Sequence, residues 1–201
     1  CRLADSFISF VLGRAPTLEY LNATIPKSEN LPILPGIEYF LYYDPVEKDS
    51  KISNISRPLE QINELYKIVS KYHEKLYCET TSSNNNNNSI ISNLQFQSFH
   101  YLQDFNLEVY EWKNNLIEEL YWTKTELKSK GYNPNQMSFR YQYYLILLSV
   151  NRDFMDIFTD STEWDTSKNI CIEVIEEVYY SLTCFNLYHS FKYATLTMVY
   201  L

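Results

Sequence analysis

A chain of 201 residues, of which 45% are hydrophobic and 16% aromatic, is large and apolar enough to bury a core, and this composition excludes a chain disordered throughout. The formal net charge of −8 argues against direct contact with nucleic acid, because binding to phosphates needs a basic surface. Only 3 glycines occur, too few for a fold with many tight turns, so we predict an all-α protein.

The first part of the chain combines a short helix with an extended segment. Residues 5–12 form a short amphipathic run that reads as a helix. Residues 13–57 are rich in proline, and each proline lacks a backbone donor and disfavours helix in the residue before it. We therefore expect 13–57 to be loop-rich and extended, with at most a short helix over residues 36–43.

Helical periodicity begins at Pro58 and is interrupted by a tract of asparagines. Leu59, Ile62, Leu65, Val69 and Leu76 recur at intervals of three or four residues, which predicts a helix of about five turns. Residues 84–88 are all Asn. Because such a tract offers nothing to pack into a core, residues 80–90 are expected to be a disordered, low-complexity insertion.

The remainder of the chain is expected to be helical. A long helix over residues 96–130, with one possible break, would end at Lys130, Gly131 and Pro134. A helix over 139–158 is apolar on nearly every side and should be central. A further helix over 167–182 would place apolar residues on one face, and residues 190–201 are a candidate last helix. The apolar residues of that face are Ile172, Ile175, Val178, Tyr179 and Leu182.

No catalytic or metal-binding constellation is visible in the sequence. His73-Glu74 begins like the zinc-protease helix, but Tyr77 stands where the second histidine must lie. His73 is therefore assigned to a solvated helix face. Asp153 and Asp156 form one loose acidic group rather than the facing clusters that hold Mg²⁺. The 4 cysteines lack CxxC spacing, which argues against a zinc site and a disulfide framework.

Two other groups of residues were considered as parts of a site. Glu173, Glu176 and Glu177 are interpreted as an exposed acidic helix face. The 19 tyrosines suit either a packed core or the wall of a ligand pocket. The most apolar run, residues 143–150, is far shorter than the ~20 residues that span a bilayer, so no membrane partner is expected.

Four short motifs follow one another along the chain. The first is Asp5 with the turn Leu12-Gly13-Arg14-Ala15-Pro16, and the second is a helix around Trp112. The third is an apolar helix that ends in Asn-Arg-Asp-Phe, and the fourth is Phe191-Lys192-Tyr193-Ala194. In this order the motifs resemble the regulatory middle homology region of fungal zinc-cluster (Zn2Cys6) transcription factors, in which Ala15 would be an insertion and His-Arg-Pro-Phe stands for Asn-Arg-Asp-Phe. The family motif residues are Asp5, Gly13, Arg14, Pro16, Trp112, Arg152, Phe154 and Tyr193.

The resemblance implies a piece of a longer, nuclear transcription factor that controls RNA polymerase II transcription. The zinc cluster that binds DNA would lie upstream and outside this chain, so zinc is expected there and no cofactor here. Residues 1–201 would then be a non-enzymatic regulatory domain that acts by intramolecular inhibition, ligand sensing or partner docking. Its partners would be transcriptional co-regulators and a possible small hydrophobic ligand. Gly13, Arg14 and Pro16 would shape a structural turn.

One alternative belongs to a different class of protein. The same resemblance extends to a kinetochore DNA-binding subunit, in which the domain is a purely architectural helical scaffold without a ligand. A thermal-shift screen with small hydrophobic compounds would separate the two interpretations, because a bound ligand raises the melting temperature.

Overall fold

The computed structural model describes residues 5, 7–9, 39–54, 56–77, 88–152, 154–155 and 162–193. Within these ranges the chain is mostly helical, which confirms the all-α class, and a single β-hairpin is added to the helices. The turn at Gly13, Arg14 and Pro16 lies outside the described residues, as do 80–87 of the expected insertion, Asp153, Asp156 and residues 194–201. The elements are β1 (Tyr39–Asp44), β2 (Asp49–Asn54), α2 (Ser56–Tyr77), α3 (Asn88–Asn114), α4 (Lys124–Lys130), α5 (Pro134–Arg152), α6 (Thr162–His189) and the 3-10 turn η3 (Phe191–Tyr193).

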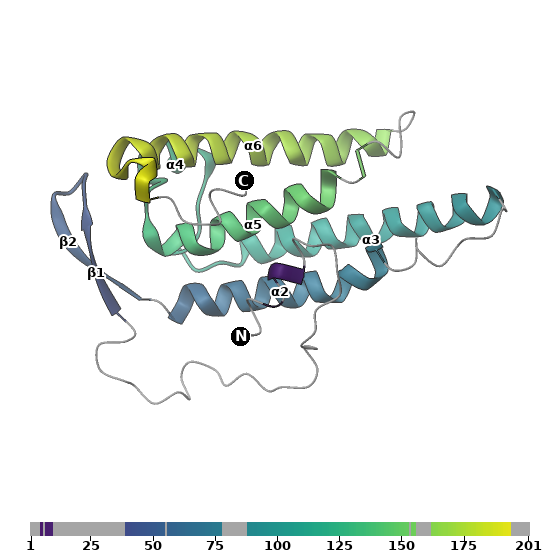
Figure 1. The fold of residues 1–201 in the computed structure, drawn as a ribbon, viewed down its shortest axis with the longest axis horizontal. Coiled ribbons are helices and arrows are strands. Elements are labelled where there is room, and N and C mark those ends of the chain that lie inside the picture. The colour runs from purple at the N-terminus through teal and green to yellow at the C-terminus, as the bar shows by residue number, and fades with distance from the viewer. Residues whose placement is uncertain are drawn as a thin grey trace.

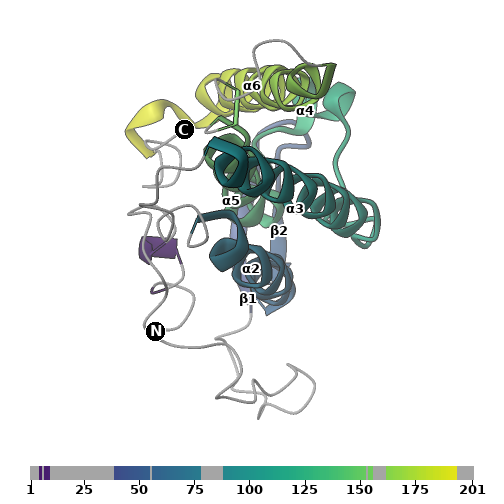
Figure 2. The ribbon, with the colours of Figure 1, turned by 90° about the vertical axis from the view of Figure 1, so that its right-hand side faces the viewer.

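The long helices form a layered bundle with α5 in the middle. Figure 1 shows α6 along one side, α2 along the other and α5 between them. In the end-on view of Figure 2, α3 lies next to α5, and α3 also packs on α2. The prediction that the apolar helix is central is confirmed, since α5 contacts α2, α3 and α6. No described helix has both the length and the hydropathy needed to cross a membrane.

The core is aromatic where α3, α5 and the segment before α4 meet. Trp122 is almost completely buried, and its ring centroid lies 5.7 Å from that of Phe139 and 5.4 Å from that of Tyr143. Trp112 stacks on Tyr143 at 5.8 Å. Each such side chain contributes roughly 1.5–3 kcal/mol on burial, so this group is a major source of stability.

The hairpin β1–β2 corrects the expectation of a short helix over residues 36–43. The strands pair antiparallel, with Leu41 opposite Ile52 and Asp44 opposite Asp49. Four of the 6 residues of β1 are Tyr or Phe, which suits a strand. The Asp44 carboxylate accepts hydrogen bonds from the amides of Val46 at 2.9 Å and Glu47 at 3.1 Å, which closes the turn. Prolines indicated irregular backbone, but Pro45 lies in this turn and leaves both strands intact.

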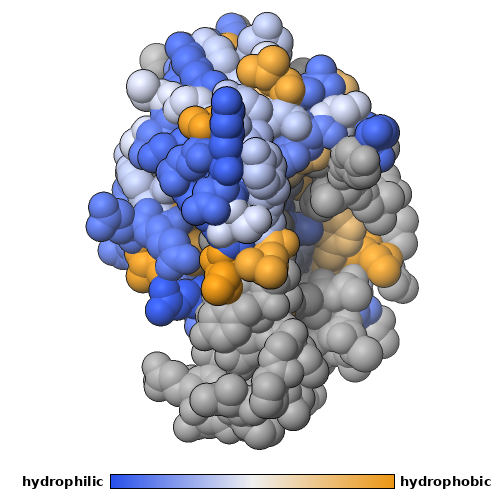
Figure 3. All heavy atoms as spheres, turned by 90° about the vertical axis from the view of Figure 1, so that its left-hand side faces the viewer, coloured by the Kyte–Doolittle hydropathy of each residue, from blue (hydrophilic) through white to orange (hydrophobic). Residues whose placement is uncertain are grey.

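The hairpin is anchored to the bundle through its inner face. The Tyr132 hydroxyl donates a buried 2.8 Å hydrogen bond to Asp44, and Lys51 forms an ion pair with Asp44 at 3.0 Å. On the outer face, Leu41 and Ile52 are exposed. Figure 3 views the molecule from the end where the hairpin lies. The coloured residues there form a mainly hydrophilic surface with separate hydrophobic patches.

Helix boundaries differ from the expectation around α3, α4 and α5. α3 begins at Asn88, before the expected start at residue 96, and the expected break falls between Asn114 and α4. Thr123 and Glu126 form a reciprocal capping box that starts α4. Gly131 has φ −59°, so it caps α4 in the right-handed conformation and not in the left-handed one that glycine often takes at helix ends. The helix does end at Lys130, as expected. Pro134 follows that end and also begins α5, because a backbone donor is not needed in the first turn of a helix.

The buried face of α6 also differs from the one expected. Val178 is buried as predicted, but Ile172, Ile175 and Tyr179 are exposed at 48%, 56% and 64%. Instead, the face of α6 that packs against the bundle contains polar as well as apolar residues. Its buried members are Ser167, Cys171, Val174, Glu177, Val178, Ser181, Cys184 and Phe185.

Two polar residues assigned to solvent are buried. Glu177 is 4% exposed and His73 is 6% exposed. Burial lowers the pKa of His73 below its ordinary value of 6.5, since removing the ring from water disfavours its charged form. The expectation of a solvated face at these positions was wrong.

Candidate ligand groove and the buried Glu177 cluster

A groove of about 370 Å³ opens between α3 and α6, with α5 beneath it. The size lies in the range of small-molecule sites, roughly 300–1,000 Å³. Most of its surface is apolar. The apolar and aromatic lining residues are Phe99, Leu102, Leu107, Tyr110, Tyr143, Leu147, Ile170 and Val174.

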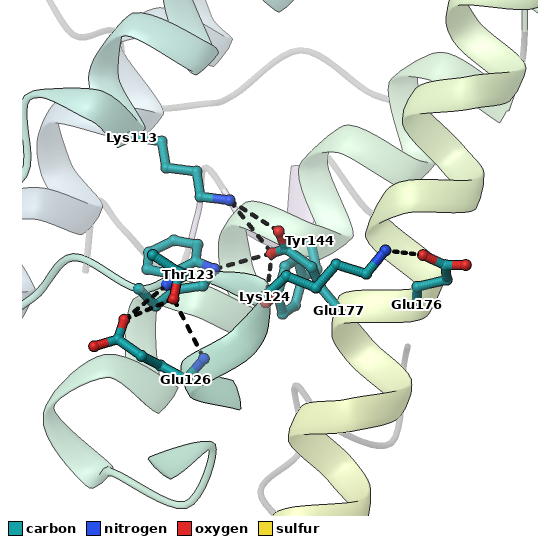
Figure 4. Close-up of polar contacts among 8 residues, drawn as sticks. Lys113, Thr123, Lys124, Glu126, Tyr144, Glu176 and Glu177 are labelled. Atoms are coloured by element: carbon teal, nitrogen blue, oxygen red, sulfur yellow. Dashed lines mark hydrogen bonds and ion pairs between the residues drawn. The ribbon is translucent and has the colours of Figure 1, made fainter. Parts of the chain in front are cut away.

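Polar groups line the groove where Lys113 of α3 and Glu177 of α6 approach each other. The Lys113 ammonium lies 3.0 Å and 3.4 Å from the two Glu177 carboxylate oxygens. The same carboxylate accepts hydrogen bonds from Trp122 Nε1 and from the Tyr144 hydroxyl, both at 2.9 Å. Figure 4 shows Lys113 and Tyr144 directed at the Glu177 carboxylate. The buried charge is therefore compensated by a cation and two neutral donors.

The aromatic residues around this ion pair hold the lysine in place. Lys113 Nζ lies 4.9 Å from the ring centroid of Trp122 and 5.4 Å from that of Tyr143, within the range of cation–π attraction. Burial raises the pKa of Tyr144 far above 10.0, and the Glu177 carboxylate raises it further. Tyr144 therefore stays protonated and remains a donor to Glu177.

Two further lining groups carry unused hydrogen-bonding capacity. Tyr143 is 5% exposed, and its hydroxyl makes no hydrogen bond to the described part of the chain. Burial raises the pKa of Tyr143, and the carboxylates of Glu177 and Glu173 raise it further. Glu173 lines the groove and forms no ion pair with a described residue. A bound molecule could use both groups.

A second buried polar cluster, one turn after Glu177 on the same buried face of α6, fixes this helix against α4 and α5. Arg140 is fully buried, and its guanidinium donates to the Gly131 carbonyl and to the Ser181 hydroxyl. The Tyr141 hydroxyl lies 2.8 Å from the Ser181 hydroxyl. Because the carbonyl belongs to the C-terminal end of α4, the cation also stabilises the negative end of that helix. Gln136 completes the cluster by accepting from Arg140 at 3.1 Å.

The described residues offer no group of three or more His, Cys, Asp or Glu side chains suited to a metal ion. Cys171 and Cys184 are buried free thiols, and burial raises the pKa of Cys171. A thiol with a raised pKa is a poor nucleophile at neutral pH. The chemistry available at the groove is thus binding through apolar contact, charge and hydrogen bonds.

The predicted motif residues lie in different parts of the fold. Trp112 is buried in the aromatic core and Phe154 is buried beyond the end of α5, whereas Arg152 is exposed in the last turn of α5. Asp5 lies in the N-terminal helical residues, and Tyr193 ends η3. None of these residues lines the groove, and their role as structural motif residues stays a prediction.

A neighbouring position of the resemblance does join two helices. Asn151, which stands where the family pattern has His, is fully buried. Its side chain and that of Asn106 exchange two hydrogen bonds of 2.9 Å. This pair ties α5 to α3 beside the groove, since Asn106 is also a lining residue.

The functional side chains that sequence reasoning missed are Lys113, Tyr143, Glu173 and Glu177. The one sequence signal for Glu177 was its place one turn after Val174 and next to Val178, two apolar residues that the structure buries. The clustering of Glu173, Glu176 and Glu177 instead suggested a uniformly solvated acidic face.

Comparison with known proteins places the chain among transcriptional regulators. It is 31% identical to "Activatory protein CHA4" of Saccharomyces cerevisiae over 100% of its length. It is 32% identical to "TY1 enhancer activator" of the same yeast and 32% identical to an uncharacterized transcriptional regulatory protein of Schizosaccharomyces pombe, over 89% of the chain in each case. The chain belongs to the fungal zinc-cluster transcription factor family.

The similarity covers only a part of each of these regulators. The chain spans 28% of the length of the activatory protein, 21% of the enhancer activator and 28% of the fission yeast protein. No family model matches the chain, and no solved structure is significantly similar to it. Membership of the zinc-cluster family therefore rests on the curated relatives and agrees with the resemblance noted from the motifs.

Proposed function

We propose that this helical region is the regulatory domain of a nuclear transcription factor that controls RNA polymerase II transcription. The observation that carries the proposal is the similarity to an activatory protein over the whole of the chain. DNA would be bound by a zinc cluster elsewhere in the protein, because a region with a net charge of −8 repels phosphates. The region itself would regulate and would catalyse no reaction.

Ligand sensing is the mode of regulation that the groove supports. The groove lies between α3 and α6, so a bound molecule would contact two long helices at once. A ligand that binds one arrangement of those helices more tightly shifts the population toward it. Transcriptional co-regulators would then recognise the shifted arrangement. A purely architectural scaffold, which is the alternative for this fold, would have no use for such a site.

The test compares two tryptophan substitutions on α6. Ile170 lines the groove, so Ile170→Trp should fill it. Ile172 is 48% exposed and does not line it, so Ile172→Trp is the matched control. With the neutral probe 1-naphthylmethanol, thermal unfolding of the wild type and of Ile172→Trp should shift upward, because a ligand that binds only the folded state stabilises it. Ile170→Trp should show no shift.

The same pair of variants tests the link to transcription. Each would be placed in the full-length protein, joined to a heterologous DNA-binding domain and a reporter gene. Ile170→Trp should change reporter output, because a filled groove mimics or blocks the ligand, and Ile172→Trp should leave it at the wild-type level. Identical output from all three proteins, together with no thermal shift in the wild type, would favour the architectural scaffold.

A further inference from the structure

The charges around the groove leave one acidic group without a partner. Glu177 is compensated by Lys113, and Lys124 is paired with Glu176. Glu173 lies one turn before Glu177 and lines the groove, but no described cation forms an ion pair with it. The polar end of the groove therefore carries an excess of one negative charge.

A phenol without a hydrogen-bond partner among the described residues lines the same groove. Tyr143 is 5% exposed and lines the groove, and its hydroxyl has no hydrogen-bond partner among the residues described. Such a phenol hydroxyl is normally hydrogen-bonded to protein or water, so in a filled groove a ligand group would take the place of the solvent at this hydroxyl. Glu173, Glu177 and Tyr110 line the same groove as Tyr143, and the charges of the two carboxylates raise the pKa of its phenol beyond the effect of burial.

The rest of the groove favours an apolar part of the ligand. Phe99, Leu102 and Leu147 are buried lining residues, and they offer no hydrogen bond from their side chains. An anionic head group would face Glu173 and would have to compete with Glu177 for Lys113. A positively charged head group instead gains the attraction of Glu173 and donates hydrogen bonds, which are stronger when one partner is charged.

On these grounds, and resting on the ligand groove of the proposed function, we infer that the ligand is an amphipathic amine. Its apolar body occupies the groove between α3 and α6, and its ammonium group donates hydrogen bonds to the Glu173 carboxylate and the Tyr143 hydroxyl. Glu173 selects the charge of the ligand. The Lys113–Glu177 ion pair closes the polar end and excludes anions.

Three probes that share one ring system test this assignment on the purified protein. They are 1-naphthylmethylamine (cation), 1-naphthylmethanol (neutral) and 1-naphthylacetate (anion), titrated by calorimetry at pH 7. The amine should bind about tenfold more tightly than the alcohol, as expected for a charged hydrogen bond that is partly exposed to solvent. The anion should bind most weakly. Equal affinities for all three, or tightest binding of the anion, would overturn the inference.

Point variants locate the selectivity. Glu173→Gln should weaken amine binding about tenfold and leave alcohol binding unchanged. Glu111→Gln removes the same charge from an exposed position of α3 that does not line the groove, and it should bind as the wild type does. Tyr143→Phe should weaken the amine several-fold. If Glu173→Gln and Glu111→Gln affect the amine equally, general charge explains the preference and the site assignment is wrong.

The outcomes separate this inference from the proposed function. Binding of the neutral probe that is lost in Ile170→Trp, without any preference for the amine, would leave the groove as a ligand site and reject the amine. Failure of every probe to bind would count against ligand sensing as well. Because Glu173 is exposed, Glu173→Gln should fold normally, which keeps the comparison interpretable.

Discussion

Glu177 carries a carboxylate into the interior of the bundle, and its three donors come from α3, α5 and the segment before α4. Glu177→Gln removes the charge that compensates Lys113, whose side chain is only 12% exposed. Breaking a buried ion pair from one side is costly, so the free energy of unfolding should fall by about 3 kcal/mol. Urea denaturation followed by tryptophan fluorescence measures this loss.

The neighbouring acid supplies the control for that prediction. Glu176 and its partner Lys124 are both about half exposed, and exposed ion pairs contribute roughly 0–1 kcal/mol. Glu176→Gln should therefore be nearly neutral. Equal losses for the two variants would show that the buried cluster does not stabilise the fold in the way proposed.

Asp44 makes the attachment of the hairpin sensitive to acid. Burial alone would raise the pKa of Asp44, but hydrogen bonds from Lys51, from the Glu47 amide and from Tyr132 outweigh it and lower the pKa below its ordinary value of 3.8. A lowered folded-state pKa stabilises the fold above the unfolded-state pKa, and the stabilisation is lost as the pH falls below it. The difference in the free energy of unfolding between wild type and Asp44→Asn should have its full value above pH 3.8. It should become smaller in more acidic solution.

Measurement of unfolding by urea at several pH values checks this window. The difference should be constant between neutral pH and about pH 5, since the carboxylate is ionised in both states there. A difference that does not change with pH, or one that grows on acidification, would contradict the role assigned to the Asp44 charge.

At the scale of elements, the close contact between α4 and α6 depends on Gly131. A Cβ atom at this position would lie 2.5 Å from the Leu127 carbonyl oxygen and 3.0 Å from Ser181 Cα, so backbone would have to move. Gly131→Ala should lower the free energy of unfolding by about 1–3 kcal/mol, as overpacking does. Lys130→Ala, at the exposed neighbouring position, should have little effect. A neutral Gly131→Ala, seen by thermal denaturation, would show that α4 can withdraw from α6 without loss.

The elements differ in how far the sequence could predict them. The central place of α5 followed from its lack of a polar side, and the structure confirms it. The hairpin was missed because the prolines around it indicated irregular backbone, whereas Asp44 and Pro45 form a turn that joins two strands. The inward face of α6 was missed because Glu177 and Ser181 are buried only where partners from other helices meet them. Such partners cannot be inferred from one helix alone.

At the scale of the whole molecule, the family could be recognised from motifs but the groove could not be predicted. Its walls include Phe99 and Val174, which are distant in sequence, and its existence depends on how far α3 and α6 are held apart over α5. The motif residues that identify the family lie elsewhere in the core or outside the described residues. Family membership and the candidate site therefore rest on different parts of the chain.

The central claim is that a ligand in this groove contacts α3 and α6 together and thereby regulates a transcription factor. Hydrogen exchange of the full-length protein, with and without 1-naphthylmethylamine, tests it most directly because it reports where binding acts. We expect slower exchange in residues 99–113 and 166–177, and no slowing in these segments for Ile170→Trp. Unchanged exchange there in the wild type, at an amine concentration that raises its melting temperature, would contradict the claim.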